Sequence, residues 1–169
     1  MKEIVTRYDF PDRMYYFVAK SYPSNDNTTL YVSLHNNIGV KITEFAIIAE
    51  QAARILAAMF EFINYYGGTG DSYGIEVGFT APAMEDHIIF LQRIMPPDDE
   101  ITGEPDYDNW IDTRFELSKV GLMNKREALI LRCDISNDEL NDLAITLFYS
   151  HLVMSPLNPE TYEWVADCW

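Results

Sequence analysis

Cysteine, basic residues and long apolar runs are all scarce in this sequence, and each scarcity excludes a class of protein. The two cysteines, Cys133 and Cys168, have no metal-ligand spacing, and two in 169 residues cannot form a disulfide framework. With seven methionines besides, the composition fits a reducing compartment. The longest apolar tract, at 45–62, is interrupted by charged residues and therefore predicts no membrane span.

The first ten residues predict no secretory signal. They read MKEIVTRYDF, are charged from the second position and contain no apolar segment. We therefore expect a cytoplasmic protein.

Basic residues are too few for a nucleic-acid or membrane-surface protein. The chain has 12 Lys and Arg against 27 Asp and Glu, a net charge of −15. Binding to nucleic acid or to anionic lipid needs a basic footprint, which this composition does not supply. A negative field of this size instead attracts basic partners.

Catalytic and metal-binding motifs are also missing. The glycine-rich segment at 67–74 lacks the lysine of a P-loop and follows a predicted helix, whereas phosphate-binding loops precede one. Glu85-Asp86-His87 has no further ligand at a useful spacing, and the chain has only three histidines. We therefore predict no enzyme, no metal and no cofactor.

What the sequence does contain is enough apolar material for one domain spanning residues 1–169. Hydrophobic residues make up 48% of the chain and aromatic residues 14%. Runs of β-forming residues predict a single antiparallel or mixed sheet of five to seven strands, at 14–21, 28–35, 38–42, 74–80, 87–95, 113–119 and 127–133. Strands that follow one another without intervening helices indicate an α+β fold.

Two main helices are predicted to pack on this sheet, followed by a short one. The first spans about 44–65, with Thr43 as its N-cap and Gly67-Gly68 as its end. The second begins at the capping box Ser136-Asn137-Asp138-Glu139 and runs to about Leu152. A short C-terminal helix is expected from about 158 to 167. In both halves of the chain, strands are thus followed by one helix.

The helix predicted at 44–65 is apolar on nearly all sides. Its polar stripe consists only of Glu50, Arg54 and Glu61. Such a helix must be buried on most sides. It is either a central core helix or the interface of a homodimer, and the dimer would suit an acidic chaperone for an exported protein.

The most unusual segment is an acidic loop at about 96–112. Residues 98–112 contribute −7 of the net −15, and residues 1–97 and 113–169 contribute −4 each. The loop also contains two aromatic residues of the kind that anchor protein interfaces. We therefore predict that it binds a partner through Asp98, Asp99, Glu100, Glu104, Asp106, Tyr107, Asp108, Trp110 and Asp112.

Three interpretations of this loop compete. It resembles a calcium loop in part, but Asn109 stands where the bidentate glutamate of an EF-hand belongs. It can also be a solvated loop without a ligand. The third interpretation is that it presents its carboxylates to a basic groove of a partner. If fully extended the loop would span about 50 Å, with one charge per ~7 Å. This spacing is sparser than the one charge per ~1.7 Å of duplex DNA. A compact loop, or added acids from Asp134, Asp138, Glu139 and Asp142, would be needed to rival DNA.

The sequence therefore favours a non-catalytic acidic protein that inhibits a basic, nucleic-acid-handling partner. Anti-CRISPR, anti-restriction and toxin-immunity proteins have this profile, and electrostatic steering gives such inhibitors fast association. The alternatives are the dimeric chaperone and an enzyme without a sequence signature, whose site would include His87, Asp86 and Tyr73.

Overall fold

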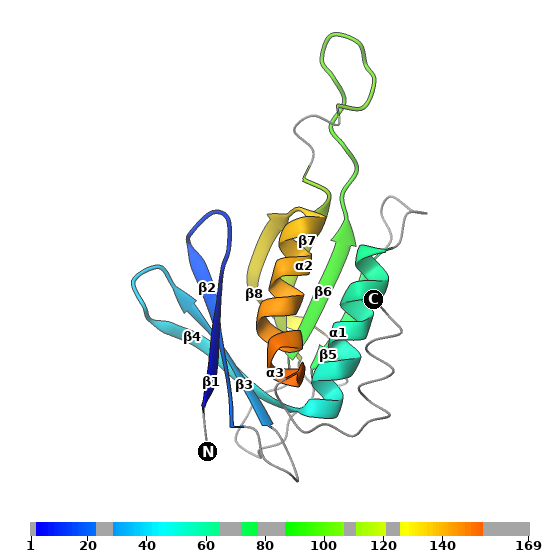
Figure 1. The fold of residues 1–169 in the computed structure, drawn as a ribbon. Helices are drawn as coiled ribbons and strands as arrows, with labels where there is room; N and C mark the ends of the chain where they lie inside the picture. Colours follow the sequence, from blue (N-terminus) through cyan, green and yellow to red (C-terminus); the bar gives the residue numbers. More distant parts are fainter. Residues whose placement is uncertain are drawn as a thin grey trace.

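The computed structural model describes residues 3–22, 29–64, 72–77, 87–106, 111–120 and 126–153. Eight strands in these residues form two four-stranded antiparallel sheets, each connected as a meander (Figure 1). The first sheet contains β1 (Ile4–Asp9), β2 (Tyr15–Ser21), β3 (Thr29–Asn36) and β4 (Lys41–Ile48). The second contains β5 (Ser72–Val77), β6 (His87–Arg93), β7 (Thr113–Val120) and β8 (Arg126–Ile135).

The predicted α+β class is confirmed, but the single sheet of five to seven strands is wrong. A helix separates β4 from β5, and β5 pairs with β6 rather than with a strand of the first sheet. β1 was not predicted at all, although Ile4–Asp9 alternates between more buried and more exposed side chains as a half-buried strand does.

Each sheet is followed by a helical segment. After β4 comes α1 (Ala49–Ile63), and after β8 come α2 (Asn137–Ala144), the π-helical segment η2 (Ile145–Tyr149) and α3 (Ser150–Val153). The two halves thus repeat one pattern of four strands and a helical segment, whereas the sequence indicated only that strands precede a helix in each half. The expected helix at 158–167 and the Gly67-Gly68 stop lie outside the described residues.

Thr43 is not the N-cap of the first helix. Residues 44–48 continue β4, because Phe45 and Ile47 face the core and pair with Val32 and Leu30 of β3. The apolar content of this segment suits a helix and a strand equally, and the pairing with β3 decides between them. The helix begins after Ile48, whose N–H donates to Gln51 Oε1 at 3.1 Å.

The capping box predicted at the second helix is confirmed. Glu139 N–H donates to Ser136 Oγ at 3.2 Å, and Ser136 N–H donates to Glu139 Oε2 at 2.9 Å. Both groups would otherwise be unpaired donors at the start of α2.

The helical segment of each half packs against elements of the other half, so that the two halves share one hydrophobic core. η2, which belongs to the second half, packs on β1 and β2, while α1 of the first half packs beside α2 and against β5. Phe10, directly after β1, and Phe17 of β2 contact Phe115 of the second sheet, with ring centroids 5.6 and 6.1 Å apart. Neither sheet therefore has a separate core.

This arrangement buries α1 within the chain, as predicted for a core helix. Eight of its residues are buried, and the polar stripe of Glu50, Arg54 and Glu61 is exposed. Arg54 and Glu50 form an ion pair of 2.8 Å on that stripe. Among the described helices, none is long and apolar enough to cross a membrane. The homodimer through residues 44–65 stays a prediction.

Candidate partner-binding surface

Residues 98–106 of the predicted acidic loop fold into a compact hairpin, which we name the acidic hairpin. Asp98 and Pro105 form an isolated β-bridge. Asp99 N–H donates to the Glu104 carbonyl at 2.7 Å, and Asp106 N–H donates to the Pro97 carbonyl at 2.7 Å. The hairpin projects from the end of β6, well clear of the two sheets (Figure 1). In its described part, the loop is neither extended nor without structure.

Asp99 organises the turn of the hairpin. Its Oδ1 accepts hydrogen bonds from the N–H groups of Ile101 at 2.8 Å and Thr102 at 3.2 Å. These bonds, chiefly the one from Ile101, lower the pKa of Asp99 below its ordinary value. Gly103 closes the turn with a φ of 70°, a left-handed conformation that glycine adopts without steric cost. Asp99 is therefore a structural residue of the hairpin as well as one of its charges.

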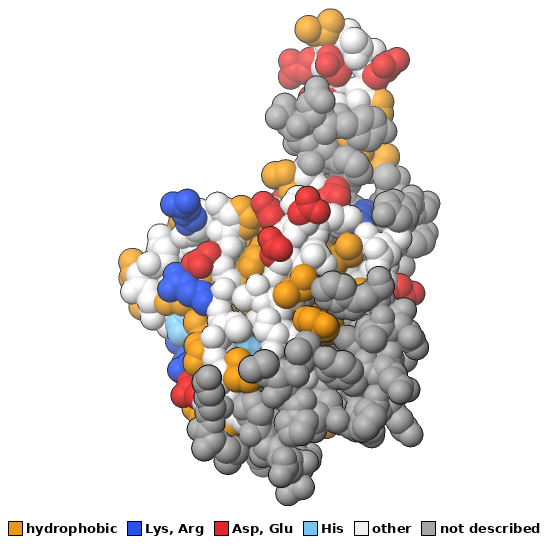
Figure 2. All heavy atoms as spheres, in the orientation of Figure 1, with side chains coloured by type: hydrophobic (Ala, Val, Ile, Leu, Met, Phe, Trp, Pro, Cys, Tyr) orange, Lys and Arg blue, Asp and Glu red, His pale blue; other side chains and the backbone are white. Residues whose placement is uncertain are grey.

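Three other carboxylates of the hairpin are available to a partner. Asp98, Glu100 and Glu104 are exposed and form no ion pair with any described residue. Figure 2 shows acidic side chains gathered at the far end of the projection. Beside them, Ile101 is 94% exposed, more than any other large apolar residue described. The hairpin thus presents an apolar side chain surrounded by negative charge.

Folding also raises the charge density of this segment. From its stem to its turn the hairpin is about five residues long, or ~17 Å at the rise of a β-strand. Asp98, Asp99, Glu100, Glu104 and Asp106 then give about one charge per ~3 Å. This density is about half that of duplex DNA and about twice that of the extended loop. The hairpin is therefore compact, but its own charges remain sparser than those of duplex DNA.

A second group of acids lies on the body of the protein, and we name it the α2 patch. Asp138 and Asp142 are exposed on α2, and Asp12 is exposed on the turn between β1 and β2. Glu139 and Asp142 of α2 and Asp12 all raise the pKa of the buried Tyr8 electrostatically, in addition to the larger effect of burial. In Figure 2, acidic side chains also gather on the body below the projection. Asp134 differs, because it forms an ion pair of 3.0 Å with Arg114.

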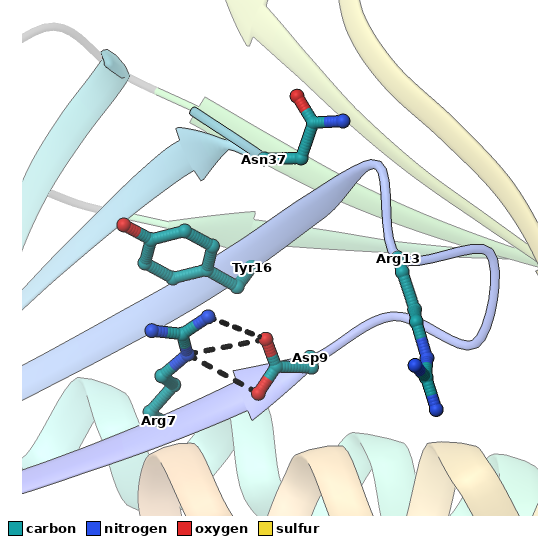
Figure 3. A pocket seen from close by; sticks show the side chains of 5 residues that line it. All are labelled: Arg7, Asp9, Arg13, Tyr16 and Asn37. Atoms are coloured by element: carbon teal, nitrogen blue, oxygen red, sulfur yellow. Dashed lines mark hydrogen bonds and ion pairs between the residues drawn. The ribbon is translucent and has the colours of Figure 1, made fainter. Parts of the chain in front are cut away.

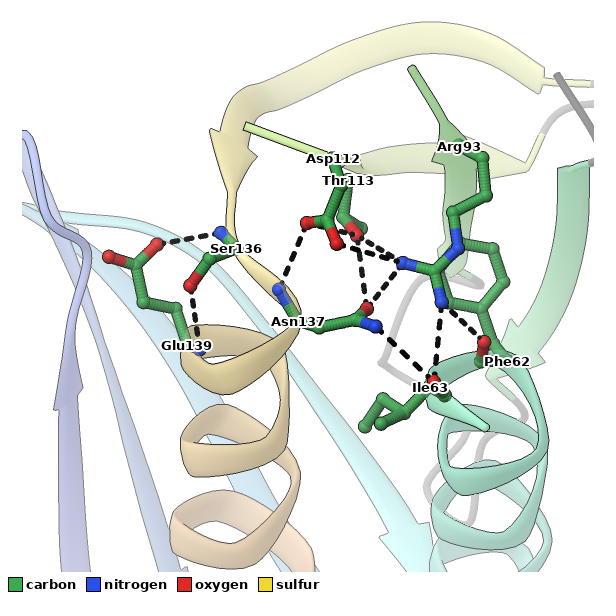
Figure 4. A network of polar contacts seen from close by, with 8 residues as sticks. All are labelled: Phe62, Ile63, Arg93, Asp112, Thr113, Ser136, Asn137 and Glu139. Atoms are coloured by element: carbon green, nitrogen blue, oxygen red, sulfur yellow. Dashed lines mark hydrogen bonds and ion pairs between the residues drawn. The ribbon is translucent and has the colours of Figure 1, made fainter. Parts of the chain in front are cut away.

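The stem of the loop is held by a buried arginine. Arg93, at the end of β6, donates to the Phe62 carbonyl at 2.7 Å and to Thr113 Oγ1 at 2.9 Å, and it also bonds Asn137 Oδ1 (Figure 4). Its guanidinium covers the Phe62 ring at 4.2 Å. The cation thereby satisfies the carbonyl end of α1, where a helix dipole favours positive charge.

Asp112 belongs to this stem and not to the acidic hairpin. Its Oδ1 accepts from Asn137 N–H, the first residue of α2, at 3.0 Å, and its Oδ2 lies 3.6 Å from Arg93 Nη1. Ile94 N–H donates to the Asp112 carbonyl at 3.0 Å and closes the stem. The structure therefore gives Asp112 a structural position. Tyr107, Asp108 and Trp110 lie outside the described residues.

The structure describes some of the residues considered for calcium and for catalysis. No group of three or more His, Cys, Asp or Glu in the described ranges is arranged to hold a metal ion. His87 is fully buried, with Nε2 2.8 Å from Thr43 Oγ1 and its ring against Phe45. Asp86 lies outside the described residues, and the side chain of Tyr73 is likewise not described.

Sequence reasoning missed two residues that matter at this surface. Ile101 is a single apolar residue within the acidic segment. It could have been identified from the sequence, but the prediction considered only the acidic and aromatic residues of the loop. Arg93 is the last residue of a strand, and nothing in the sequence indicated that its side chain turns back toward two helix ends. No protein-family model matches the sequence, and the search of curated proteins finds no match either.

Proposed function

We propose that this protein is a non-catalytic inhibitor that occupies a basic surface of a nucleic-acid-handling protein. The observation that carries the proposal is the acidic hairpin, whose carboxylates Asp98, Glu100 and Glu104 project away from the body without a described basic partner. In this proposal the hairpin enters the groove with which the partner binds nucleic acid. The α2 patch would add charge where such a groove meets the body.

The partner is proposed to be a protein because of Ile101. Interfaces between proteins have an apolar centre and a polar rim. The exposed Ile101 side chain, with carboxylates around it, has the same arrangement on a smaller scale. The net charge of −15 would steer the protein toward a basic partner and accelerate association. We place this interaction in the cytoplasm.

A capture experiment with matched charge variants tests the proposal. The hairpin variant carries D98N, E100Q and E104Q, and the control carries E44Q, E50Q and E61Q on exposed or half-exposed positions of β4 and α1. Both variants lose three negative charges, so any difference between them reports the position of the charge. Tagged proteins would be used to capture partners from an extract of the source cells at low and high salt.

We expect a basic nucleic-acid-binding protein to be captured by the wild type and the control but not by the hairpin variant, with capture decreasing at high salt. With the purified partner, the hairpin variant should associate about ten-fold more slowly at low salt. The wild type should also displace a short DNA or RNA ligand from the partner. Equal association rates for the hairpin variant and the control would show that the hairpin is not the interface.

The apolar contribution is tested separately with I101S, which changes no charge. We expect faster dissociation of the complex and an unchanged salt dependence of the association rate, because charge sets encounter and buried contacts set lifetime.

A further inference from the structure

A pocket of about 420 Å³ lies on the first sheet, away from the acidic hairpin. It is lined by Arg7, Asp9, Arg13, Tyr16 and Asn37. Figure 3 shows Arg7, Asp9 and Tyr16 together on one side, Arg13 on the turn between β1 and β2, and Asn37 on the opposite side from Arg7. A volume of this size falls in the range of ~300–1,000 Å³ that small-molecule sites occupy.

One wall of the pocket is a guanidinium held in a fixed position. Arg7 Nε and Nη2 both bond the Asp9 carboxylate, at 3.1 and 2.8 Å to Oδ1. The guanidinium carbon lies 3.7 Å from the centre of the Tyr16 ring, and this ring also stacks on the His35 ring, with centroids 5.0 Å apart. This leaves Arg7 Nη1 without a described hydrogen-bond acceptor. Such a preorganised donor loses little entropy when it binds a ligand.

The second cation, Arg13, is exposed and forms no ion pair with any described residue. Its φ of 58° lies in the left-handed region, which is unfavourable for a residue with a Cβ atom. The turn enforces this conformation, because Arg13 N–H donates to the Phe10 carbonyl at 2.9 Å and Met14 N–H donates to Asp12 Oδ1 at 2.9 Å. A glycine would fit this position with less strain. Residues held in such conformations cluster at functional sites.

The charge of the pocket opposes that of the whole protein. Its two arginines and one aspartate give a net charge of +1, in a chain of −15. Asp9 forms an ion pair with Arg7. Asp12, beside Arg13 in the chain, lies outside the pocket lining and accepts the Met14 N–H, but it keeps its negative charge. Arg7 Nη1, the Arg13 guanidinium and the amide group of Asn37 are therefore the groups left to meet a ligand. Guanidinium groups bind planar or tetrahedral oxyanions with paired N–H donors.

We propose that this pocket binds a small organic anion through a phosphate or carboxylate group. Arg13 would bind the oxyanion, the remaining N–H groups of Arg7 would orient it, and Asn37 would contact the uncharged part of the ligand. This site is independent of the acidic hairpin and would serve a different ligand from the proposed partner.

Titration with inorganic phosphate and with acetate tests the proposal and separates the two anion types. Both would be added at constant ionic strength while the Nε–Hε signals of the arginines are followed by NMR. We expect the Arg7 and Arg13 signals to shift and to saturate with a Kd of about 1 mM or tighter. Saturation by phosphate alone would assign a phosphate ester, and saturation by acetate alone would assign a carboxylate.

Two variants give the comparison. R13G should weaken binding at least ten-fold while leaving the melting temperature equal or higher, because glycine relieves the backbone strain. R54Q removes one positive charge from the ion pair on α1 and should bind as the wild type does. A linear shift without saturation for both anions, or equal binding by R13G and wild type, would overturn the proposal.

Discussion

Replacement of Arg93 by methionine should destabilise the protein by about 2–4 kcal/mol. Arg93 is 7% exposed and lies where the end of α1, the start of α2 and the stem of the acidic loop meet. Methionine preserves most of the aliphatic volume but provides no donor. The substitution therefore isolates the polar contribution of the guanidinium.

The magnitude follows from the groups that lose their partner. The Phe62 carbonyl and the Thr113 hydroxyl lose charged donors at 2.7 and 2.9 Å. An acceptor left unsatisfied in the interior costs about 1–3 kcal/mol. Asp112 keeps its bond from Asn137 N–H but loses the cation at 3.6 Å. Since water can reach the partly exposed Asp112 side chain, the sum stays below that of a fully buried broken pair.

Urea unfolding followed by circular dichroism would measure this loss, with two matched variants. R54M removes an exposed arginine in an ion pair with Glu50 and should cost no more than about 0.5 kcal/mol. R93K keeps the charge but not the planar fork, so it should lie between R93M and wild type.

Hydrogen exchange would show what the arginine holds. In R93M, we expect faster exchange at Ile94 N–H in the stem, while Asp99 and Asp106 within the hairpin keep their protection. A loss of stability below about 1 kcal/mol in R93M would refute the view that Arg93 joins the two helix ends.

Three further predictions concern single residues. His151 is 1% exposed, and burial lowers its pKa to about 4, so the unfolded state binds a proton more readily than the folded state. The free energy of unfolding should therefore fall as the pH decreases from about 6.5 to 4, by about 3 kcal/mol at most. Urea unfolding at a series of pH values should show this loss in the wild type and not in H151Q. S136A should cost about 1 kcal/mol in urea unfolding because it removes the side-chain acceptor at the start of α2, and a cost near zero would contradict the capping role. Burial, together with Asp12, raises the pKa of the Cys133 thiol to about 12. Iodoacetamide at pH 8 should therefore modify Cys133 only after the protein is unfolded, and peptide mapping would detect the modification.

Local patterns in the sequence predicted most of the strands and the start of α2. Runs of β-forming residues located seven of the eight described strands, although the strand predicted at 38–42 covers only the start of β4. Ser136 with Glu139 marks a helix start through hydrogen bonds between residues three apart. Charge counting located the acidic loop, because formal charge does not depend on folding. These features require only interactions between neighbours in the chain.

Features that depend on distant pairing could not be predicted in this way. Thr43 has the local signature of an N-cap, but β3 offers Ile47 and Phe45 partners in a sheet, and the strand continues. The division into two sheets likewise depends on which strand edge β5 meets. In both cases a local preference of a fraction of a kcal/mol competes with the burial of several large side chains, and burial is the larger effect.

The acidic surface shows the same division most clearly. Composition alone determined that the protein is strongly negative and that residues 98–112 carry almost half of that charge. Only the tertiary structure decided which of these acids project on a hairpin, which one, Asp112, turns inward to Arg93 and Asn137, and that Arg7 and Arg13 form a positive pocket elsewhere. The physical reason is that total charge is a sum over residues, whereas the electric field at a surface depends on where the backbone places each of them.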